Sequence, residues 1–544
     1  MSRLEIASPK KAKIVMEGLY KDLERRIESS PPGLCPVDMA RAFLELCHAQ
    51  TCGKCVPCRI GLGQLNNFIR EVLDGKATMK TLDIMEQTAL SIMESADCAI
   101  GYEAANMVYK GLIGYRDDYV EHIQNGRCTC TYNQPVPCVS LCPAHVDIPG
   151  YVALVGEGRY ADAIRLLRKD NPFPTTCGFI CEHPCEARCR RNMVDDSINI
   201  RGLKRVAADF AGEVDPPQCA PDTGKKIAIL GGGPGGLSAA YYLQLMGHQT
   251  TVYEMLPKLG GMLRYGIPNY RLPKDRLDDD IRAILKTGVQ VKNGLKIGQD
   301  ITIQQLRQEY DVVLITIGAS TDKKLGLENE DADGILSAVQ FLRNVGKNQI
   351  MDLTGKEVAV IGGGNVSMDA VRTAKRLGAK KVSIVYRRRV ADMTALPGEI
   401  EGAVAEGIEL QTLKAPASID VDENHHVKGI YVTPQMVSSI RDGRASIKPT
   451  GEEDIYIPCD VLIVAIGQNI ETHHFEQAGI PVERGKIVTK STGAFENLPG
   501  VFAGGDCASG PASVIKAIAA AKVVAANIDE YLGYHHEISC DVEI

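Results

Sequence analysis

The sequence has no apolar run long enough to cross a membrane. Its longest runs, DVVLITIGA (311–319) and DVLIVAIG (460–467), have only the length of a β-strand. The opening stretch, MSRLEIASPKKAKIVMEGLY, also has neither the apolar segment nor the small-residue cleavage site of a secretion signal. We therefore expect a cytoplasmic protein without membrane insertion.

Basic residues are not in excess either. The formal net charge is −7, and the one dense basic run, Arg387-Arg388-Arg389, is too short to follow a polyanion. A nucleic-acid partner is therefore not expected. The sequence also shows no Ser-His-Asp or Cys-His arrangement. We expect no side chain to serve as a catalytic acid, base or nucleophile.

Cysteine, in contrast, is abundant. Fourteen of the 18 cysteines precede residue 190. Disulfides are rare in a reducing compartment, so cysteines this dense are better explained as metal ligands.

The second half of the chain alternates short β-branched strands with helices and Gly-rich turns, which is the pattern of parallel α/β units. It contains an internal repeat, because residues 225–254 and 356–389 each have the pattern of strand, Gly-rich turn, helix and strand. A chain of 544 residues is long enough for about three to four domains. Two nucleotide-binding units imply two nucleotides, or a fold with a redundant copy.

The first Gly-rich turn is typical of a dinucleotide site. Gly231, Gly233, Pro234 and Gly236 follow the apolar strand IAIL. Such glycines permit a tight turn, backbone approach to a pyrophosphate at the helix N-terminus, and close packing of helix on strand. Glu254 ends the second strand, where it can accept hydrogen bonds from ribose hydroxyls. A purely structural turn is the alternative, which this context disfavours.

The second Gly-rich turn favours a different nucleotide. Gly362 and Gly364 are followed by Asn365 and Val366, and Ser367 stands where the third glycine would be. Arg387 and Arg388 follow the second strand in place of an acid. An acid there would repel a 2′-phosphate, whereas arginines would pair with it, so the motif predicts NADP(H). A solvated basic loop is the alternative.

A third motif, GVFAGGDCASGPASV, lies near the C-terminus. It predicts a strand, an acidic turn with Gly505 and Asp506, and a long helix that begins near Ser513 and Val514. Asp506 could hold a ribityl hydroxyl, and the N–H groups of the helix start could face the electron-rich edge of a flavin.

Together these motifs resemble the small-subunit family of glutamate synthase over about residues 121–540. GGGPGGL with Glu254 resembles that family's FAD adenosine-diphosphate site, and GGGNVSMD followed by YRR resembles its NADPH site. GGDCASGPASV is similar to its closing flavin motif. The segment KLGGMLRYGIPNYRLP (258–273), which contains Gly261, Met262 and Arg271, resembles the stretch alongside the flavin. The resemblance implies two Rossmann-like domains that bind FAD and NADP(H).

The cysteines of residues 128–189 are typical of [4Fe–4S] ligation, because dense thiolates accompany the pair Cys142-Pro143; zinc is the alternative. The same family and dihydropyrimidine dehydrogenase have a matching domain with two clusters and interleaved ligands. That resemblance implies one cluster on Cys128, Cys130, Cys138 and Cys189. It implies a second cluster on Cys142, Cys181 and Cys185.

The fourth ligand of the second cluster departs from the related pattern. The glutamine that completes it in dihydropyrimidine dehydrogenase falls at Lys204, which cannot bind iron in this way, so Cys177 is the candidate substitute. The early spacing also differs, being C-x-C-x7-C in place of the family's C-x2-C-x4-C.

A separate cysteine triplet lies in TCGKCVPCRIG (51–61). Cys52, Cys55 and Cys58 need a fourth ligand, and Cys98 is the next cysteine along the chain. The pattern C-x2-C-x2-C-x39-C resembles the cluster-bearing helical domain of the NADH-oxidising flavoprotein subunit of respiratory complex I and of soluble hydrogenases. It implies a third [4Fe–4S] cluster, with a zinc-stapled domain as the alternative. About 50 residues precede the triplet, too few for the FMN- and NADH-binding part of that subunit. We therefore expect this domain to hold a cluster without a flavin of its own.

We therefore predict an α/β protein with two helical iron–sulfur domains ahead of two Rossmann-like domains. The expected ranges are 1–120 for the N-terminal cluster domain, 121–218 for the two-cluster domain, 219–345 with 469–544 for the FAD domain, and 346–468 for the NADP(H) domain.

The sum of these modules resembles the NADP(H)-binding subunit of electron-bifurcating transhydrogenases that link NADH, ferredoxin and NADPH. The resemblance implies an enzyme that exchanges hydride between NADPH and FAD and passes single electrons through three [4Fe–4S] clusters. The partners would be an FMN/NADH hydrogenase-type subunit and ferredoxin. One alternative is a glutamate synthase small subunit that supplies an amidotransferase, and another is a non-catalytic electron-relay subunit.

Overall fold

A computed structural model describes residues 15–16, 18–21, 35–125, 136–187, 189–441, 444–540 and 542. The chain divides into two compact units. The first comprises residues 1–148 and 183–200, and the second comprises residues 149–182 and 201–544. The predicted segment 121–218 is thus divided between the two units.

The first unit is helical, as the sequence predicts. In α2 (Pro36–Ala49) the buried side chains of Val37, Ala40, Phe43, Leu44 and Cys47 recur at helical spacing and face the apolar sides of the other helices. Its elements are α2 (Pro36–Ala49), a π-helical turn η1 (Pro57–Gly61), α3 (Leu62–Leu73), α4 (Met79–Ser95), α5 (Ala99–Gly114), α6 (Arg116–Asn125), α7 (Pro137–Leu141), α11 (Pro184–Ala187) and η2 (Arg190–Met193).

The second unit begins with short helices that belong to the cysteine-rich segment. They are α8 (Ile148–Gly156), α9 (Tyr160–Asp170), α10 (Pro174–Ile180) and α12 (Ile200–Phe210). Asp280 anchors α10 to the rest of this unit, because its buried carboxylate accepts the N–H groups of Thr175 (3.3 Å) and Thr176 (2.7 Å). Burial raises the pKa of Asp280 to about 6, although the Thr176 N–H acts in the opposite direction.

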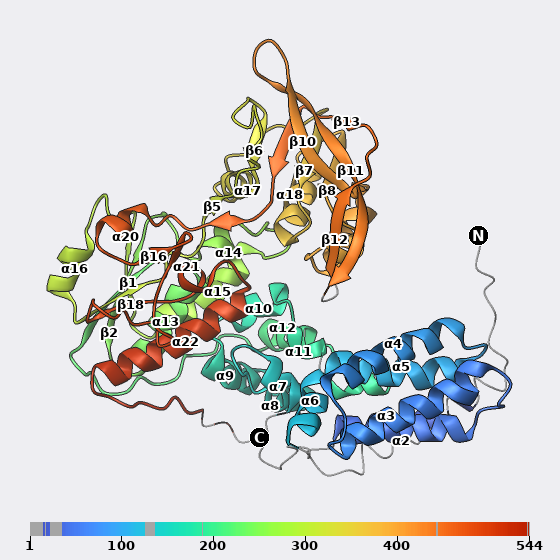
Figure 1. The fold of residues 1–544 in the computed structure, drawn as a ribbon. Helices are drawn as coiled ribbons and strands as arrows, with labels where there is room; N and C mark the ends of the chain where they lie inside the picture. The colour runs from blue at the N-terminus through green and yellow to red at the C-terminus, as the bar shows by residue number, and fades with distance from the viewer. Residues whose placement is uncertain are drawn as a thin grey trace. The chain divides into compact units, whose positions relative to one another are not determined.

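The first nucleotide-binding region is a parallel sheet of order β18-β4-β1-β2-β3. Its central strands are buried on both faces, which explains why they are uniformly apolar. The strands are β1 (Lys226–Leu230), β2 (Gln249–Glu254), β3 (Gln290–Asn293), β4 (Val312–Ile315) and β18 (Val501–Ala503). The helices are α13 (Pro234–Leu245), α14 (Met262–Tyr265), α15 (Lys274–Leu285), α16 (Ile303–Glu309), α20 (His473–Gln477), α21 (Asp506–Ser509) and α22 (Val514–Tyr531). Helices α13 and α22 pack against each other (Figure 1).

The second nucleotide-binding region repeats this plan, which confirms the internal repeat. Its parallel sheet has the order β6-β14-β7-β8-β9. The strands are β6 (Ile335–Ser337), β7 (Glu357–Ile361), β8 (Lys381–Tyr386), β9 (Glu409–Thr412) and β14 (Val461–Val464), and the helices are α17 (Ala338–Gly346), α18 (Asn365–Arg376) and α19 (Pro397–Ala405). Strand β6 joins this sheet although it precedes residue 346.

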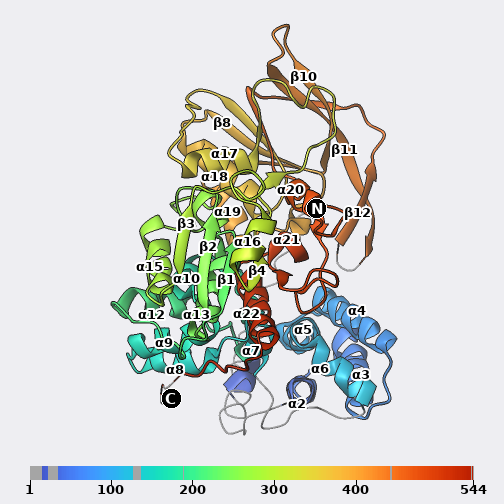
Figure 2. The same ribbon diagram turned by 90° about the vertical axis from the view of Figure 1, so that its left-hand side faces the viewer.

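An antiparallel sheet extends from the second region and is orange in Figures 1 and 2. It contains β10 (Lys414–Val421), β11 (Val427–Arg441), β12 (Arg444–Pro449) and β13 (Ile455–Pro458). Two short antiparallel pairs complete the strands, β5 (Thr321–Asp322) with β15 (Gln468–Asn469) and β16 (Val482–Glu483) with β17 (Lys486–Ile487). Among the described helices, none combines the length and apolar character needed to cross a bilayer.

Candidate dinucleotide and iron–sulfur sites

The first Gly-rich turn connects β1 to α13 in the predicted way. Gly233 caps the helix and Pro234 occupies its first turn. Gly236 meets the turn so closely that a Cβ there would lie 1.9 Å from the Gly231 carbonyl oxygen, so only glycine fits. Among the described residues no side chain caps the α13 N-terminus, which fits the binding of a dinucleotide pyrophosphate there.

Glu254 lies at the end of β2 beside this turn. Its carboxylate accepts the N–H groups of Gly232 and Leu256, both at 2.8 Å, and its side chain is buried. Burial raises the pKa of Glu254, and the two N–H groups act in the opposite direction. A cavity of about 80 Å³ adjoins it, lined by Gly231, Tyr253, Glu254, Leu295, Ile297 and Phe475 among others. An acid at the edge of an apolar cavity fits the ribose and the adenine of a nucleotide.

The segment 258–273 lies against the same turn. The Gly260 N–H donates to the Gly232 carbonyl at 2.8 Å, and a Cβ on Gly261 would come within 2.8 Å of the Gly233 Cα. Met262 then begins α14. The predicted site residues Gly261 and Met262 are thus adjacent to the first Gly-rich turn.

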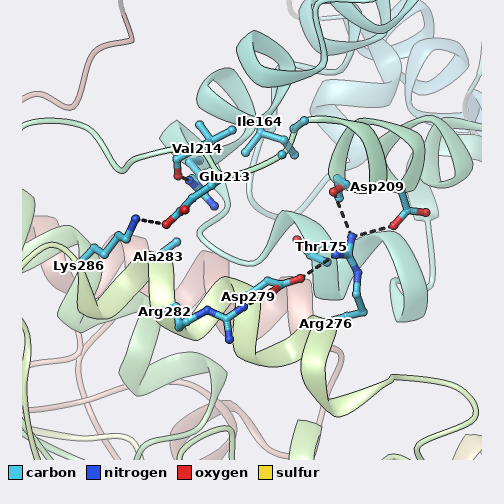
Figure 3. Close-up of a pocket in the computed structure, with 14 residues that line it drawn as sticks. Ile164, Thr175, Asp209, Glu213, Val214, Arg276, Asp279, Arg282, Ala283 and Lys286 are labelled. Carbon is cyan, nitrogen blue, oxygen red and sulfur yellow. Dashed lines mark hydrogen bonds and ion pairs between the residues drawn. The ribbon is translucent and has the colours of Figure 1, made fainter.

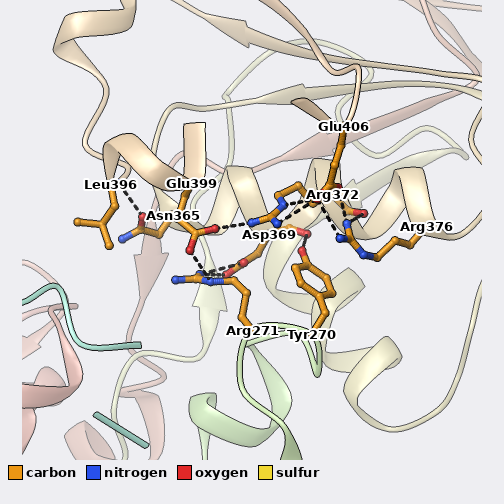
Figure 4. Close-up of polar contacts among 9 residues, drawn as sticks. All are labelled: Tyr270, Arg271, Asn365, Asp369, Arg372, Arg376, Leu396, Glu399 and Glu406. Carbon is orange, nitrogen blue, oxygen red and sulfur yellow. Dashed lines mark hydrogen bonds and ion pairs between the residues drawn. The ribbon is translucent and has the colours of Figure 1, made fainter. Parts of the chain in front are cut away.

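Arg271, from the same segment, is engaged by the second nucleotide-binding region. Its guanidinium donates to both carboxylate oxygens of Asp369 at 2.9 and 2.8 Å and pairs with Glu399 at 3.0 Å (Figure 4). Asp369 lies on α18, the helix that begins at the second Gly-rich turn. Burial raises the pKa of Asp369 to about 6, with Arg271 acting in the opposite direction.

Further contacts extend this network, which the sequence motifs did not indicate. Arg372 bonds to Glu399 at 2.5 Å and to Glu406 at 3.0 Å. The guanidinium of Arg376 lies 3.9 Å from the centre of the Tyr270 ring, within the range of a cation–π contact. Figure 4 shows Tyr270 and Arg271 directed toward α18 from below. We call Arg271, Asp369 and Glu399 the interdomain clamp, because they join the predicted FAD and NADP(H) regions.

The second Gly-rich turn connects β7 to α18. Gly362 follows the strand directly, Gly364 caps the helix, and Val366 is half-buried in its first turn. The Asn365 side chain accepts the Leu396 N–H at 3.0 Å and donates to Glu182 at 3.1 Å. Ser367 is fully buried, and its hydroxyl has no hydrogen-bond partner among the described residues.

The three arginines after β8 differ in their surroundings. Arg389 is held by Asp392, which its Nε contacts at 2.8 Å. Arg387 is exposed and makes no ion pair with any described residue, and Arg388 is half-buried beside it. The exposed Arg387 is therefore available to an incoming phosphate, which fits the 2′-phosphate of NADP(H), and Arg388 lies next to it in the chain.

The C-terminal motif adjoins the first sheet. Gly505 caps α21, and Asp506 begins it directly after β18. Burial raises the pKa of Asp506 to about 6, with the Ala512 N–H acting in the opposite direction. Ser513 caps the long helix α22, which begins at Val514. A half-buried acid and a helix N-terminus in this order fit the ribityl chain and the ring edge of a flavin.

The four N-terminal cysteines come together although Cys98 is distant in sequence. The thiol of Cys58 is buried and adjoins those of Cys52, Cys55 and Cys98, and burial with these neighbours raises its pKa to about 12. The sulfur of Cys55 accepts the backbone N–H groups of Cys58 and Asp97, which lower its pKa although burial raises it. The described cysteines form no disulfide. Four adjacent thiols with N–H donors to sulfur fit a [4Fe–4S] cluster.

Gly101 shows how closely this group is enclosed. A Cβ at this position, in the first turn of α5, would lie 2.5 Å from the Cys58 sulfur and 2.9 Å from the Ala96 Cβ. The site therefore requires glycine beside the thiolate.

The cysteines of the predicted two-cluster segment lie in both compact units. In the first unit α7 packs against α11, so their cysteines share one region, and the thiol of Cys138 adjoins that of Cys189. Cys142 and Cys185 are buried there. Cys128 and Cys130 lie outside the described residues.

In the second unit Cys177 and Cys181 are buried neighbours on α10 and at its C-terminal end. Burial raises the pKa of Cys177, and the nearby Cys181 thiol acts in the same direction. The buried Lys204 opposes both effects, and its Nζ lies 5.9 Å from the centre of the Tyr151 ring.

A pocket of about 330 Å³ lies apart from the Gly-rich turns, between α9, α10 and α12 on one side and α15 on the other (Figure 3). Three of its cations are already paired. Arg276 bonds to Asp209 and Asp279, both at 2.7 Å, Lys286 bonds to Glu213 and Asp215, and Arg282 pairs with Asp279. The fourth, the buried Arg168, donates to the Val214 carbonyl. These contacts join α15 to α12 and to the segment that follows it.

Comparison with known proteins agrees with this geometry. Residues 225–521, more than half of the chain, match the family model of pyridine nucleotide-disulphide oxidoreductases. The chain belongs to this family. Residues 38–122 match the NADH-ubiquinone oxidoreductase-F iron–sulfur binding region, and residues 114–215 match the 4Fe-4S cluster domain II of dihydropyrimidine dehydrogenase. It is an oxidoreductase of the type that combines FAD, NADP(H) and [4Fe–4S] clusters, as the sequence predicts.

Several curated relatives match most of this oxidoreductase. The NADP(+)-dependent formate dehydrogenase subunit beta of Moorella thermoacetica is 32% identical over 90% of this chain and 79% of its own length. The NADPH-Fe(3+) oxidoreductase subunit beta of Geobacter sulfurreducens is 34% identical over 92% and 79%. The glutamate synthase [NADPH] small chain of Escherichia coli is 33% identical over 73% and 88%.

A solved structure shares the fold of the dinucleotide-binding part. It is the His57Gln mutant of FprA from Mycobacterium tuberculosis, which is 20% identical and covers 58% of this chain and 85% of its own, with a TM-score of 0.50.

Proposed function

We propose that this chain is the NADP(H)-binding subunit of an electron-bifurcating complex that links NADH, ferredoxin and NADP. One observation carries the proposal: four adjacent thiols at Cys52, Cys55, Cys58 and Cys98 occur in the same chain as two dinucleotide turns. Such a chain can take hydride at its dinucleotide sites and deliver single electrons through its cysteine-bound clusters, because a bound flavin can exchange electrons either in pairs or one at a time.

The residues of the first region would bind FAD. Gly231, Gly233, Pro234 and Gly236 would hold the pyrophosphate, and Glu254 would accept hydrogen bonds from the ribose. The remaining assigned residues would bind the flavin half of FAD, and they are Gly261, Met262, Arg271, Gly505, Asp506, Ser513 and Val514. The contacts of Arg271 indicate that it acts by fixing α18.

The residues of the second region would bind NADP(H). Gly362, Gly364, Asn365 and Val366 would hold its pyrophosphate at the N-terminus of α18. Arg387 and Arg388 would pair with the 2′-phosphate and so favour NADPH over NADH.

Three [4Fe–4S] clusters are assigned to the cysteines. Cys52, Cys55, Cys58 and Cys98 would hold the N-terminal one. Cys128, Cys130, Cys138 and Cys189 would hold the second, and the adjacency of Cys138 and Cys189 supports this pairing. The third would use Cys142, Cys181 and Cys185 with Cys177, whose burial next to Cys181 supports it as fourth ligand.

The relatives support a partner other than an amidotransferase. The two subunits named for formate dehydrogenase and for Fe(3+) reduction match 90% and 92% of this chain, whereas the glutamate synthase small chain matches 73%. We therefore infer partner subunits that are themselves redox enzymes, of the FMN/NADH hydrogenase type. A partner that oxidises formate is the second candidate, because the first of these relatives is named for it.

An anaerobic NADPH titration of the reconstituted chain tests the proposal. NADPH should bleach the flavin absorbance and then produce EPR signals of reduced clusters, whereas NADH should do neither. Iron and acid-labile sulfide should correspond to three clusters. Reduction by NADH alone would contradict the NADP(H) assignment, and flavin bleaching without any cluster signal would contradict the electron path.

Substitution of Gly101 by alanine should remove the N-terminal cluster. The added Cβ would lie 2.5 Å from the Cys58 sulfur, so the thiolate could not keep its position. We expect the iron content to fall by one cluster and one EPR signal to disappear, with flavin bleaching by NADPH retained. Gly156→Ala is the matched control, since nothing lies within 4 Å of that Cβ position. An unchanged EPR spectrum in the Gly101 variant would place the cluster elsewhere.

A further inference from the structure

The N-terminal cysteine group has one side that reaches the surface. Cys58 is buried, whereas Cys52 is exposed. Beside it, Val56 and Ile60 are 55% and 52% exposed, although they are large apolar side chains. They are four residues apart around the π-helical turn η1, a spacing that brings side chains to the same side of a helical turn.

Two cations accompany these apolar side chains. Lys54 and Arg59 are exposed, and neither makes an ion pair or a side-chain hydrogen bond with any described residue. In the same helical unit Arg41, Arg70 and Arg116 are each paired with a carboxylate. Asp97 is an exposed acid that immediately adjoins the group, so the side chains of Lys54, Arg59 and Asp97 together carry a net positive charge.

We propose that Lys54, Val56, Arg59 and Ile60, here called the triplet face, dock an acidic electron-transfer protein of the ferredoxin type. The inference rests on the proposed function, because it requires a cluster at Cys52, Cys55, Cys58 and Cys98. Two apolar side chains would exclude water at the contact, and two unpaired cations would attract carboxylates around the partner's redox centre.

The size and charge of the face favour a transient partner over a permanent subunit. Permanent interfaces are large and mostly apolar, whereas electron-transfer encounters are small and steered by charge. The whole chain carries a net charge of −7, so it would repel an acidic protein in general. A local positive face is then needed to direct such a partner to the cluster.

The electron balance of the encounter is simple. In the proposed complex two reduced ferredoxins would give one electron each and one NADH would give two, and two NADP⁺ with one further proton would take the four electrons as two NADPH. The reverse reaction oxidises two NADPH and reduces two ferredoxins and one NAD⁺. The face changes the rate of encounter and leaves the chemistry at the nucleotide unchanged.

Charge reversal tests the face directly. We would measure the second-order rate constant of the reconstituted chain with a reduced, acidic two-[4Fe–4S] bacterial ferredoxin at several ionic strengths, and the Kd of the oxidised ferredoxin by calorimetry. The double variant Lys54→Glu/Arg59→Glu should lower the rate constant at low salt about tenfold or more, weaken binding, and flatten the salt dependence. The neutral variant Lys54→Gln/Arg59→Gln should have an intermediate effect.

The matched control is Lys80→Glu/Lys110→Glu, which makes the same charge change on exposed lysines. Lys80 lies 12 residues along α4 from Ile92, whose side chain adjoins Gly61 of η1, and Lys110 lies 12 residues from Cys98, the N-cap of α5. Twelve helical residues span about 18 Å. The control should stay within about twofold of the parent, and cytochrome c, a basic acceptor, should not be slowed by the Lys54/Arg59 reversal.

The outcomes separate this inference from the proposed function. An unchanged ferredoxin rate and Kd in the Lys54/Arg59 variant, with its cluster EPR signal intact, would overturn the docking face alone. Equal slowing in the Lys80/Lys110 control would do the same. A parent protein without an N-terminal cluster signal would overturn the proposed function and this inference with it.

Discussion

Substitution of Arg271 by methionine should slow flavin reduction by NADPH about 100-fold, the order expected when reacting groups are displaced by about 1 Å. Arg271 lies in the segment beside the first Gly-rich turn, and Asp369 lies on the helix of the second. Because Arg271 Nη1 donates to both carboxylate oxygens of Asp369, this contact fixes one predicted dinucleotide site relative to the other. Reduction of the flavin by dithionite should be unchanged, because it does not require NADPH to be aligned.

The same substitution should also lower stability. Asp369 would lose both bonds to Arg271, and Glu399 would keep only Arg372. Removal of one member of a buried ion pair costs about 3–5 kcal/mol of unfolding free energy. Arg271→Lys keeps the positive charge but loses the planar guanidinium with its several N–H donors. We therefore expect an intermediate loss of both the flavin-reduction rate and the unfolding free energy.

Stopped-flow absorbance and thermal unfolding measure these effects, and Arg282→Met is the matched control. Arg282 also pairs with an aspartate, but its side chain is 65% exposed, so its loss should change stability by less than about 1 kcal/mol. A separate titration should show NADP⁺ affinity within a few-fold of the parent, because the role of Arg271 is to hold α18 in position relative to the first Gly-rich turn. A large loss of NADP⁺ affinity with an unchanged maximal rate would contradict the clamp.

The double variant Arg387→Ala/Arg388→Ala should raise the KM for NADPH by about 100-fold or more. Each hydrogen bond between charged groups contributes about 1.5–3 kcal/mol, and about 1.4 kcal/mol corresponds to a factor of ten. The KM for NADH should hardly change, because NADH has no 2′-phosphate. The ratio of kcat/KM for NADPH to kcat/KM for NADH therefore falls even if both coenzymes react at the same maximal rate.

Steady-state kinetics with both coenzymes measure this change. Lys381→Ala is the control, because Lys381 lies at the opposite end of β8 and pairs with Glu409 at the surface. It should leave both KM values unchanged. If the Arg387/Arg388 variant kept its preference for NADPH, the 2′-phosphate would have to be recognised elsewhere.

The sequence by itself determined the parts that depend on neighbouring residues. Gly231 to Gly236 and Gly362 to Gly364 predict their turns because each motif lies within one strand–turn–helix unit, where chain geometry alone sets the spacing. The buried strands are recognisable because both faces of a parallel sheet must be apolar. The pairing of Arg389 with Asp392, three residues away, was in principle visible too.

Tertiary structure alone decided the contacts between distant segments. The partners of Arg271 lie at positions 369 and 399, and no local pattern indicates that their carboxylates share one guanidinium. The closeness of Lys204 to Cys177 and of Gly101 to Cys58 likewise arises from the packing of helices. Sequence motifs fix chemistry within a turn, whereas the burial that raises the pKa of Asp369 and encloses Cys58 exists only after separate elements pack together.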